Sequence, residues 1–117
     1  MMKRLFAAAF LLAVSCSGAS ASSCNVTEFS LTADAGVQVA RTPPLVDQAP
    51  ITTSGTTAQS LAFSGDTKMV RVWCDTQSAV AWGTNPTATT NNMPLSAGVA
   101  EYFQVAPSTK AAFILRP

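Results

Sequence analysis

The side chains of this sequence that could do chemistry are three cysteines, scattered carboxylates and many hydroxyls, and the chain contains no histidine. Histidine is the commonest general base and transition-metal ligand, so most catalytic and metal-binding arrangements are removed. The acids in or beside expected turns, Asp66, Asp75 and Glu101, are isolated and form no pair at a spacing that predicts glycoside hydrolysis. No Gly-x-Ser-x-Gly motif and no Cys-x-x-Cys pair occurs. We therefore expect no enzymatic activity, no cofactor and no metal.

The N-terminus has the three parts of a cleavable export signal. Lys3 and Arg4 supply positive charge, residues 5–14 (LFAAAFLLAV) are apolar, and residues 19–21 (ASA) supply the small-x-small cleavage pattern. The apolar run is shorter than the roughly 20 residues that span a bilayer. The sequence thus predicts a signal-peptide helix within residues 1–21 and an exported product, periplasmic or extracellular, with no membrane span in its mature form.

A second processing route stays open at Cys16. The tripeptide Val14-Ser15-Cys16 resembles the end of a bacterial lipobox, in which the cysteine is lipidated and becomes the mature N-terminus. Ala13 stands where that motif usually has leucine, and a good signal-peptidase site follows. A lipoprotein anchored at Cys16 is the alternative to cleavage after Ala21.

Cleavage after Ala21 leaves Cys24 and Cys74, and an even pair of cysteines in a small exported domain predicts a disulfide. Cys74 ends an apolar alternating run, which is typical of a buried strand position. Closing a loop of this length stabilises a fold by about 4 kcal/mol on the chain-entropy model. The alternative is a pair of buried free thiols.

Composition indicates one small β domain over residues 22–117. Charged residues make up 11% of the chain, well below the roughly 25% of ordinary soluble domains, while Thr, Ser, Ala and Val are plentiful. Because Lys3 and Arg4 belong to the leader, the domain contains five basic and six acidic residues and is nearly neutral. Binding to nucleic acid driven by charge is therefore not expected.

Short strand patterns recur with turn residues between them, which favours an antiparallel β-sandwich of about seven or eight strands, Greek-key or jelly-roll-like. The expected strands are residues 25–32, 36–41, 59–64, 68–75, 78–82, 99–105 and 110–115. Residues 42–54 contain three prolines, which predicts an edge or a loop, and residues 106–109 are expected to form a hairpin connection. The expected core consists of Val70, Val72, Val80, Phe103, Val105, Phe113 and Leu115.

Three aromatic residues, Trp73, Trp82 and Tyr102, are the candidate contacts for a partner. Trp82 ends an expected strand just before a Gly-Thr-Asn-Pro turn, where its ring can stack on a sugar face or pack into a protein. The alternative interpretation is that both tryptophans fill the core of a domain that has few large residues.

The stretch from residue 59 to residue 117 resembles small β-rich structural proteins of tailed bacteriophages and prophages. The resemblance is carried by QSLAFSGDTKMVRVWCD and AWGTNPTATTNNMPLSAGVAEYFQVAPSTKAAFI. It implies a β-sandwich and a non-enzymatic virion component, such as a decoration or fibre-associated subunit, and it implies no catalytic residues. The leader and Cys24 depart from that pattern, because virion subunits assemble in the cytoplasm and need neither export nor a disulfide.

Two functional hypotheses follow. The first is a phage-type structural or interaction module, in a virion or exported, that presents edge strands or loops to a protein partner or to copies of itself. The second is an exported carbohydrate- or surface-binding module that uses Trp82 and Tyr102 as stacking platforms.

Overall fold

The computed structural model describes residues 21–30 and 42–117, and within these residues the chain forms nine β-strands and no helix. The predicted signal peptide, Cys16 and the strand expected at residues 36–41 lie outside the described residues. The strands are β1 (Ser23–Phe29), β2 (Val46–Asp47), β3 (Ile51–Thr52), β4 (Ala58–Gln59), β5 (Met69–Cys74), β6 (Ser78–Gly83), β7 (Met93–Leu95), β8 (Ala100–Gln104) and β9 (Lys110–Leu115).

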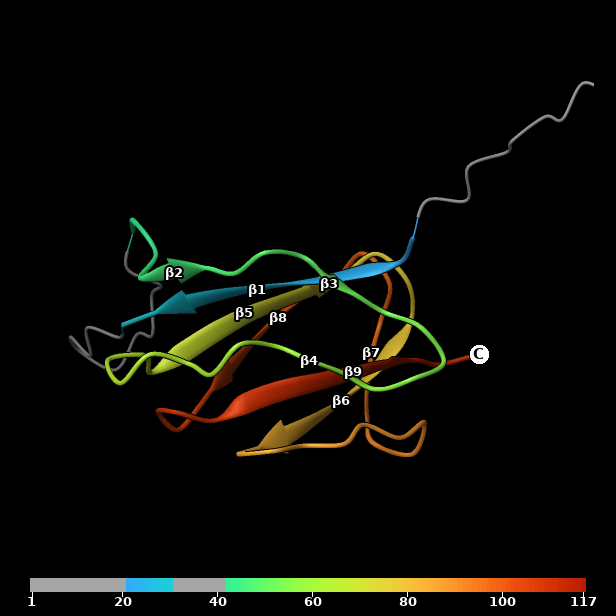
Figure 1. Cartoon of the computed structure of the whole chain (residues 1–117). Coiled ribbons are helices and arrows are strands. Elements are labelled where there is room, and N and C mark those ends of the chain that lie inside the picture. Colours follow the sequence, from blue (N-terminus) through green and yellow to red (C-terminus); the bar gives the residue numbers. More distant parts are fainter. Residues whose placement is uncertain (1–20, 31–41) are drawn as a thin grey trace, which may run out of the picture.

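The strands form two antiparallel sheets that lie one over the other (Figure 1). The first sheet has the order β2-β1-β5-β8, with β3 also paired to β1, and the second has the order β4-β9-β6-β7. The predicted all-β, antiparallel class is therefore confirmed, and the arrangement is sandwich-like. Three two-residue strands raise the count above the expected seven or eight.

The core lies between the two sheets, and β1 and β5 alternate buried and partly exposed side chains over most of their length. In β5, Val70, Val72 and Cys74 are at most 1% exposed, whereas Arg71 and Trp73 are half-buried on the other face. From the second sheet, Val80 and Phe113 enter the same cluster. Burying a valine or phenylalanine side chain contributes roughly 1.5–3 kcal/mol, so these facing rows hold the two layers together.

The predicted core residues are largely confirmed. Four of them are buried by at least 99%: Val70, Val72, Val80 and Phe113. Phe103 and Val105 are partly buried and pack against the core cluster, and Leu115 is half-buried.

The proline-containing segment after residue 41 lies at the edge of the first sheet, as predicted. β2 and β3 pair with opposite ends of β1 and flank Pro50, which itself makes no ladder pair. A proline has no N–H to donate, so it interrupts the edge between these two short strands.

The expected hairpin at residues 106–109 is wrong. β8 pairs with β5 in the first sheet and β9 pairs with β6 in the second, so this connection crosses from one layer to the other. Ser108 adopts a positive φ of 62°, and Thr109 Oγ1 donates a hydrogen bond to the Ala106 carbonyl at 2.7 Å. A four-residue connection that contains a proline can form an arch between the two layers as well as a hairpin, so the length of the connection does not distinguish the two.

The strand expected at residues 59–64 is shorter than predicted, because side chains replace some of its backbone partners. β4 ends at Gln59, and the Ala111 N–H next donates to the Ser60 hydroxyl rather than to a carbonyl. Leu61 then bonds to the side chain of Gln48. In addition, the sequence pattern missed β7, a three-residue strand interrupted by Pro94.

Candidate functional site

The predicted disulfide is confirmed, and it joins two neighbouring strands. Cys24 of β1 lies directly opposite Cys74 of β5, with Cα atoms 4.1 Å apart and a sequence separation of 50. Both residues are at most 1% exposed. The bond therefore fixes the register of β1 against β5, and β5 in turn carries the edge strand β8.

A buried carboxylate, Glu28, ties three segments together although it is only 1% exposed. Its Oε1 accepts hydrogen bonds from the Ser64 N–H at 2.8 Å and the Thr67 hydroxyl at 2.7 Å. Its Oε2 accepts one from Gln48 Nε2 at 3.0 Å. All three donors are uncharged, so the carboxylate is held by hydrogen bonds that compensate its loss of water.

Gln48 extends this network to the backbone of Leu61. Its Oε1 accepts from the Leu61 N–H at 2.9 Å, and its Nε2 also donates to the Leu61 carbonyl at 3.2 Å. The amide side chain thus makes the pair of bonds that a neighbouring strand would make. Sequence reasoning missed Glu28, although the alternation of β1 places it on the same face as Cys24 and Val26. Its burial makes it a structural group, because no ligand reaches it.

The three acids considered from the sequence are not brought together into a site. Asp75 is exposed and accepts hydrogen bonds from the Ser23 N–H at 2.9 Å and from the Thr76 hydroxyl, which ties the β5–β6 turn to the start of β1. Asp66 is exposed in a turn, and Glu101 is half-buried on β8. Within residues 21–30 and 42–117, no group of three His, Cys, Asp or Glu side chains could hold a metal ion.

The three candidate aromatic residues lie on two different faces of the molecule. Trp82 packs against Phe103 across the two sheets, with ring centroids 4.9 Å apart, so Phe103 faces inward. Side chains alternate along a strand, and Tyr102 therefore faces outward. Trp73 also faces outward, because its neighbours Val72 and Cys74 are in the core. Trp73 and Tyr102 thus share the outer face of the first sheet, and Trp82 is separated from them.

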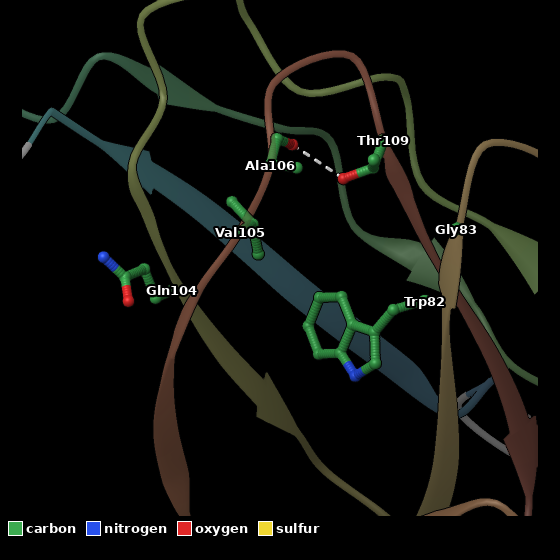
Figure 2. Close-up of a pocket in the computed structure, with 6 residues that line it drawn as sticks. All are labelled: Trp82, Gly83, Gln104, Val105, Ala106 and Thr109. Carbon is green, nitrogen blue, oxygen red and sulfur yellow. Dashed lines mark hydrogen bonds between the residues drawn. The ribbon is translucent and has the colours of Figure 1, made fainter.

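Trp82 lines a pocket of about 230 Å³ at one end of the two layers (Figure 2). Figure 2 shows its indole reaching from β6 toward the segment after β8 that carries Val105, while the Gln104 side chain points away. The six lining residues carry no charge: Trp82, Gly83, Gln104, Val105, Ala106 and Thr109. The pocket is smaller than the roughly 300–1,000 Å³ that holds drug-sized molecules, so it accommodates a single ring or a short side chain.

The edge of β8 is the second candidate feature, because among the strands that the structure describes none pairs with β8 on the side away from β5. The Val105 N–H donates to the Lys68 carbonyl at 3.0 Å, which places residue 105 among the residues that hydrogen-bond to the β5 side. In an antiparallel ladder these residues alternate, so Glu101 and Phe103 also direct their backbone groups to β5. The residues whose backbone N–H and C=O groups point away from β5 are Ala100, Tyr102 and Gln104.

Exposed apolar side chains accompany this edge. Tyr102 is 54% exposed, and Val99, which immediately precedes β8, is 49% exposed. Exposed backbone donors and acceptors beside apolar side chains are what a second β-strand needs for pairing. The edge of β8 is therefore a candidate interface for a protein.

The comparisons with known proteins assign no class to the chain: no family model matches it, and no curated protein or solved structure matches it either. Among the described residues, no helix is long and apolar enough to cross a membrane.

Proposed function

We propose that this chain is a non-enzymatic interaction module that joins a β-strand of a protein partner at the free edge of β8. The observation that carries the proposal is the length of this edge. Among the described residues, β8 has five residues, whereas the other strands at sheet edges, β2, β3, β4 and β7, have two or three. A longer edge offers more backbone hydrogen bonds to a partner strand.

The composition of the edges supports the same choice. Natural proteins protect free edges with prolines, lysines or very short strands. β7 contains Pro94, and the segment with β2 and β3 has Pro50 between the strands. β8 contains neither proline nor lysine. Its single charged residue, Glu101, lies on the same face as Phe103, so the outer face of the edge, with Ala100, Tyr102 and Gln104, carries no charge.

The finer role that we propose is that of a β-sandwich, Greek-key or jelly-roll-like, which acts as a structural subunit of phage or prophage type. The resemblance of residues 59–117 to such proteins supports a decoration or fibre-associated role. The signal-like N-terminus and the Cys24–Cys74 disulfide support an exported derivative, because disulfides persist in oxidising compartments.

Site-specific photocrosslinking in the producing cell tests the strand-joining function. A photoreactive phenylalanine analogue at position 102 should form an adduct with a protein, because Tyr102 is exposed at the proposed interface. The matched control carries the same analogue at position 90, an exposed turn residue between β6 and β7 of the second sheet. Mass spectrometry of the adducts identifies the strand that is joined.

A second substitution links the adduct to strand pairing. Gln104→Pro removes an N–H that points away from β5, so the fold keeps its ladder bonds while the edge loses a donor. We expect Gln104→Pro to reduce the position-102 adduct about tenfold and Gln104→Thr, which keeps the N–H, to leave it unchanged. Equal adducts from positions 90 and 102, or an adduct insensitive to Gln104→Pro, would contradict the proposal.

A second candidate function, glycan binding, is favoured by the uncharged pocket beside the Trp82 indole. An aromatic face in an uncharged pocket suits a neutral sugar ring. On a glycan array, the native protein should bind a neutral glycan, Trp82→Leu should reduce the signal at least about tenfold, and Trp73→Leu, on the outer face, should not. Absence of binding by the native protein, or equal losses in the two variants, would remove this candidate.

A further inference from the structure

The structure points to the identity of the strand that pairs with β8: we propose that it is β8 of a second copy of this chain, in an antiparallel register centred on Tyr102. This inference rests on the proposed function, because it names the partner of the same edge. It requires that the backbone groups, side chains and symmetry of β8 suit pairing with itself.

The backbone groups of β8 are self-complementary. The residues with free N–H and C=O groups are spaced by two, at Ala100, Tyr102 and Gln104, with Tyr102 at the centre. Two antiparallel copies related by a two-fold axis through Tyr102 pair Ala100 with the partner's Gln104, Tyr102 with the partner's Tyr102, and Gln104 with the partner's Ala100. Each such pair exchanges both of its backbone hydrogen bonds, so no free donor or acceptor of the edge is left unused.

Neighbouring registers are less favourable. A register centred on Glu101 places this carboxylate directly opposite the partner's Glu101, and like charges directly opposite each other destabilise a sheet. A register centred on Phe103 leaves Ala100 without a partner residue inside β8. Centring on Tyr102 therefore makes the most bonds and separates the carboxylates.

The side chains favour the same register. Tyr102 is 54% exposed in the single chain, and this register places its ring across from the partner's Tyr102 on the outer face of the joined sheet. Aromatic cross-strand pairs contribute to sheet stability. Tyr102 therefore gains a packing partner that the single chain does not provide.

Symmetry favours a second copy over an open chain of molecules. A two-fold contact uses the same surface on both subunits and closes after two. Pairing of β8 with a different edge of the next copy would require β2, β3, β4 or β7, and each of these offers at most three residues. The five-residue edge of β8 is matched in length only by itself among the described edges.

The register predicts which single cysteine links two copies. The experiment uses protein expressed as the full chain with Cys16→Ser, which removes the third cysteine, and a glutathione redox buffer. In the proposed register the two residues at position 102 have Cα atoms about 5.5 Å apart, within the range that a disulfide spans. The residues at position 101 are diagonal, with Cα atoms about 7–8 Å apart, beyond that range.

Tyr102→Cys should therefore form disulfide-linked dimers on a non-reducing gel at least about tenfold faster than Glu101→Cys or the exposed control Thr90→Cys. Adding Gln104→Pro to Tyr102→Cys should slow the linkage about tenfold, and adding Gln104→Thr should not. Sedimentation equilibrium of protein with the native β8 should show a monomer–dimer equilibrium that Gln104→Pro weakens by about the same factor.

The outcomes separate this inference from the proposed function. Faster linkage through Glu101→Cys than through Tyr102→Cys would overturn the register, and a monomeric native protein in which Tyr102→Cys links no faster than Thr90→Cys would overturn self-pairing. If the position-102 photocrosslink then identifies a different protein, the strand-joining function stands and only the second copy is excluded. If position 102 forms no adduct at all, both proposals fail.

Discussion

Replacing Cys24 and Cys74 together by alanine should lower the free energy of unfolding by about 4 kcal/mol, because the disulfide closes a loop of 50 positions and the unfolded chain gains that freedom when it is removed. A domain of this size has only about 5–15 kcal/mol in total, so a large share of its stability depends on one bond. Urea denaturation of the native protein and the double variant, followed by tryptophan fluorescence, measures the difference.

The control is Thr90→Ala, an exposed turn residue outside the closed loop, which should leave the free energy of unfolding unchanged. Because Cys24 and Cys74 are at most 1% exposed, a reductant should reach the bond only when the protein unfolds. The rate of reduction should therefore follow the unfolding rate as urea is raised. A double variant that unfolds within about 1 kcal/mol of the native protein would show that the closed loop is not what stabilises the fold.

The disulfide also matters for the candidate interface. Cys74 ends β5, and β5 is the strand against which β8 is aligned. If β1 slips or separates from β5, the middle of the first sheet loses its register and the edge offered by β8 changes with it. The double variant should therefore weaken pairing at β8 even under conditions where it remains folded.

The elements that sequence predicted well are apolar or alternating runs with turn residues at both ends. β9 was predicted with the bounds that the structure has, and β5 and β8 differ from their predicted ranges by a single residue at each end. Alternation along a strand predicts which side chains share a face, and the more apolar face is the one that is buried. The Cys24–Cys74 disulfide was predictable from the cysteine count, since only two cysteines follow residue 21.

Sequence could not tell which strands pair, because pairing depends on contacts between distant residues. The connection at residues 106–109 was predicted to be a hairpin and is a crossing between layers, which the position of Phe103 against Trp82 shows. The same limit applies to the candidate interface. Tyr102 was singled out as an aromatic residue, but its place on an unpaired edge follows only from the order of strands in the first sheet.

Glu28 was missed because the charge of its side chain was given more weight than its position in the alternation of β1. A glutamate in a strand is ordinarily assigned to the solvent face, and burial is favourable here only because three donors converge on it. Those donors come from Gln48, Ser64 and Thr67, which lie 20 to 39 positions away in the sequence. No pattern of neighbouring residues in the sequence predicts such a network.

The substitution Glu28→Gln should lower the free energy of unfolding by about 2 kcal/mol, although it preserves the size of the side chain. Both oxygens of Glu28 accept hydrogen bonds, and the amide replaces one of these acceptors by a donor. An amide at position 28 turns an NH₂ group toward donors. If the new NH₂ group faces Gln48, the Gln48 amide must rotate to offer it an oxygen. The rotated amide then points its NH₂ at the Leu61 N–H and its oxygen at the Leu61 carbonyl. Every orientation leaves two donors facing each other.

Glu28→Ala should cost more, about 4 kcal/mol, since it leaves three donors without their acceptor and opens a cavity. The matched control is Glu101→Gln, a half-buried glutamate on the edge strand, which should change the free energy of unfolding by less than about 0.5 kcal/mol. Native-state hydrogen exchange adds a local measurement: the Ser64 and Leu61 amides should lose protection in Glu28→Gln before the β5 amides do. If Glu28→Gln and Glu101→Gln unfold at the same urea concentration, the directional network does not hold these segments, and their position depends on apolar packing alone.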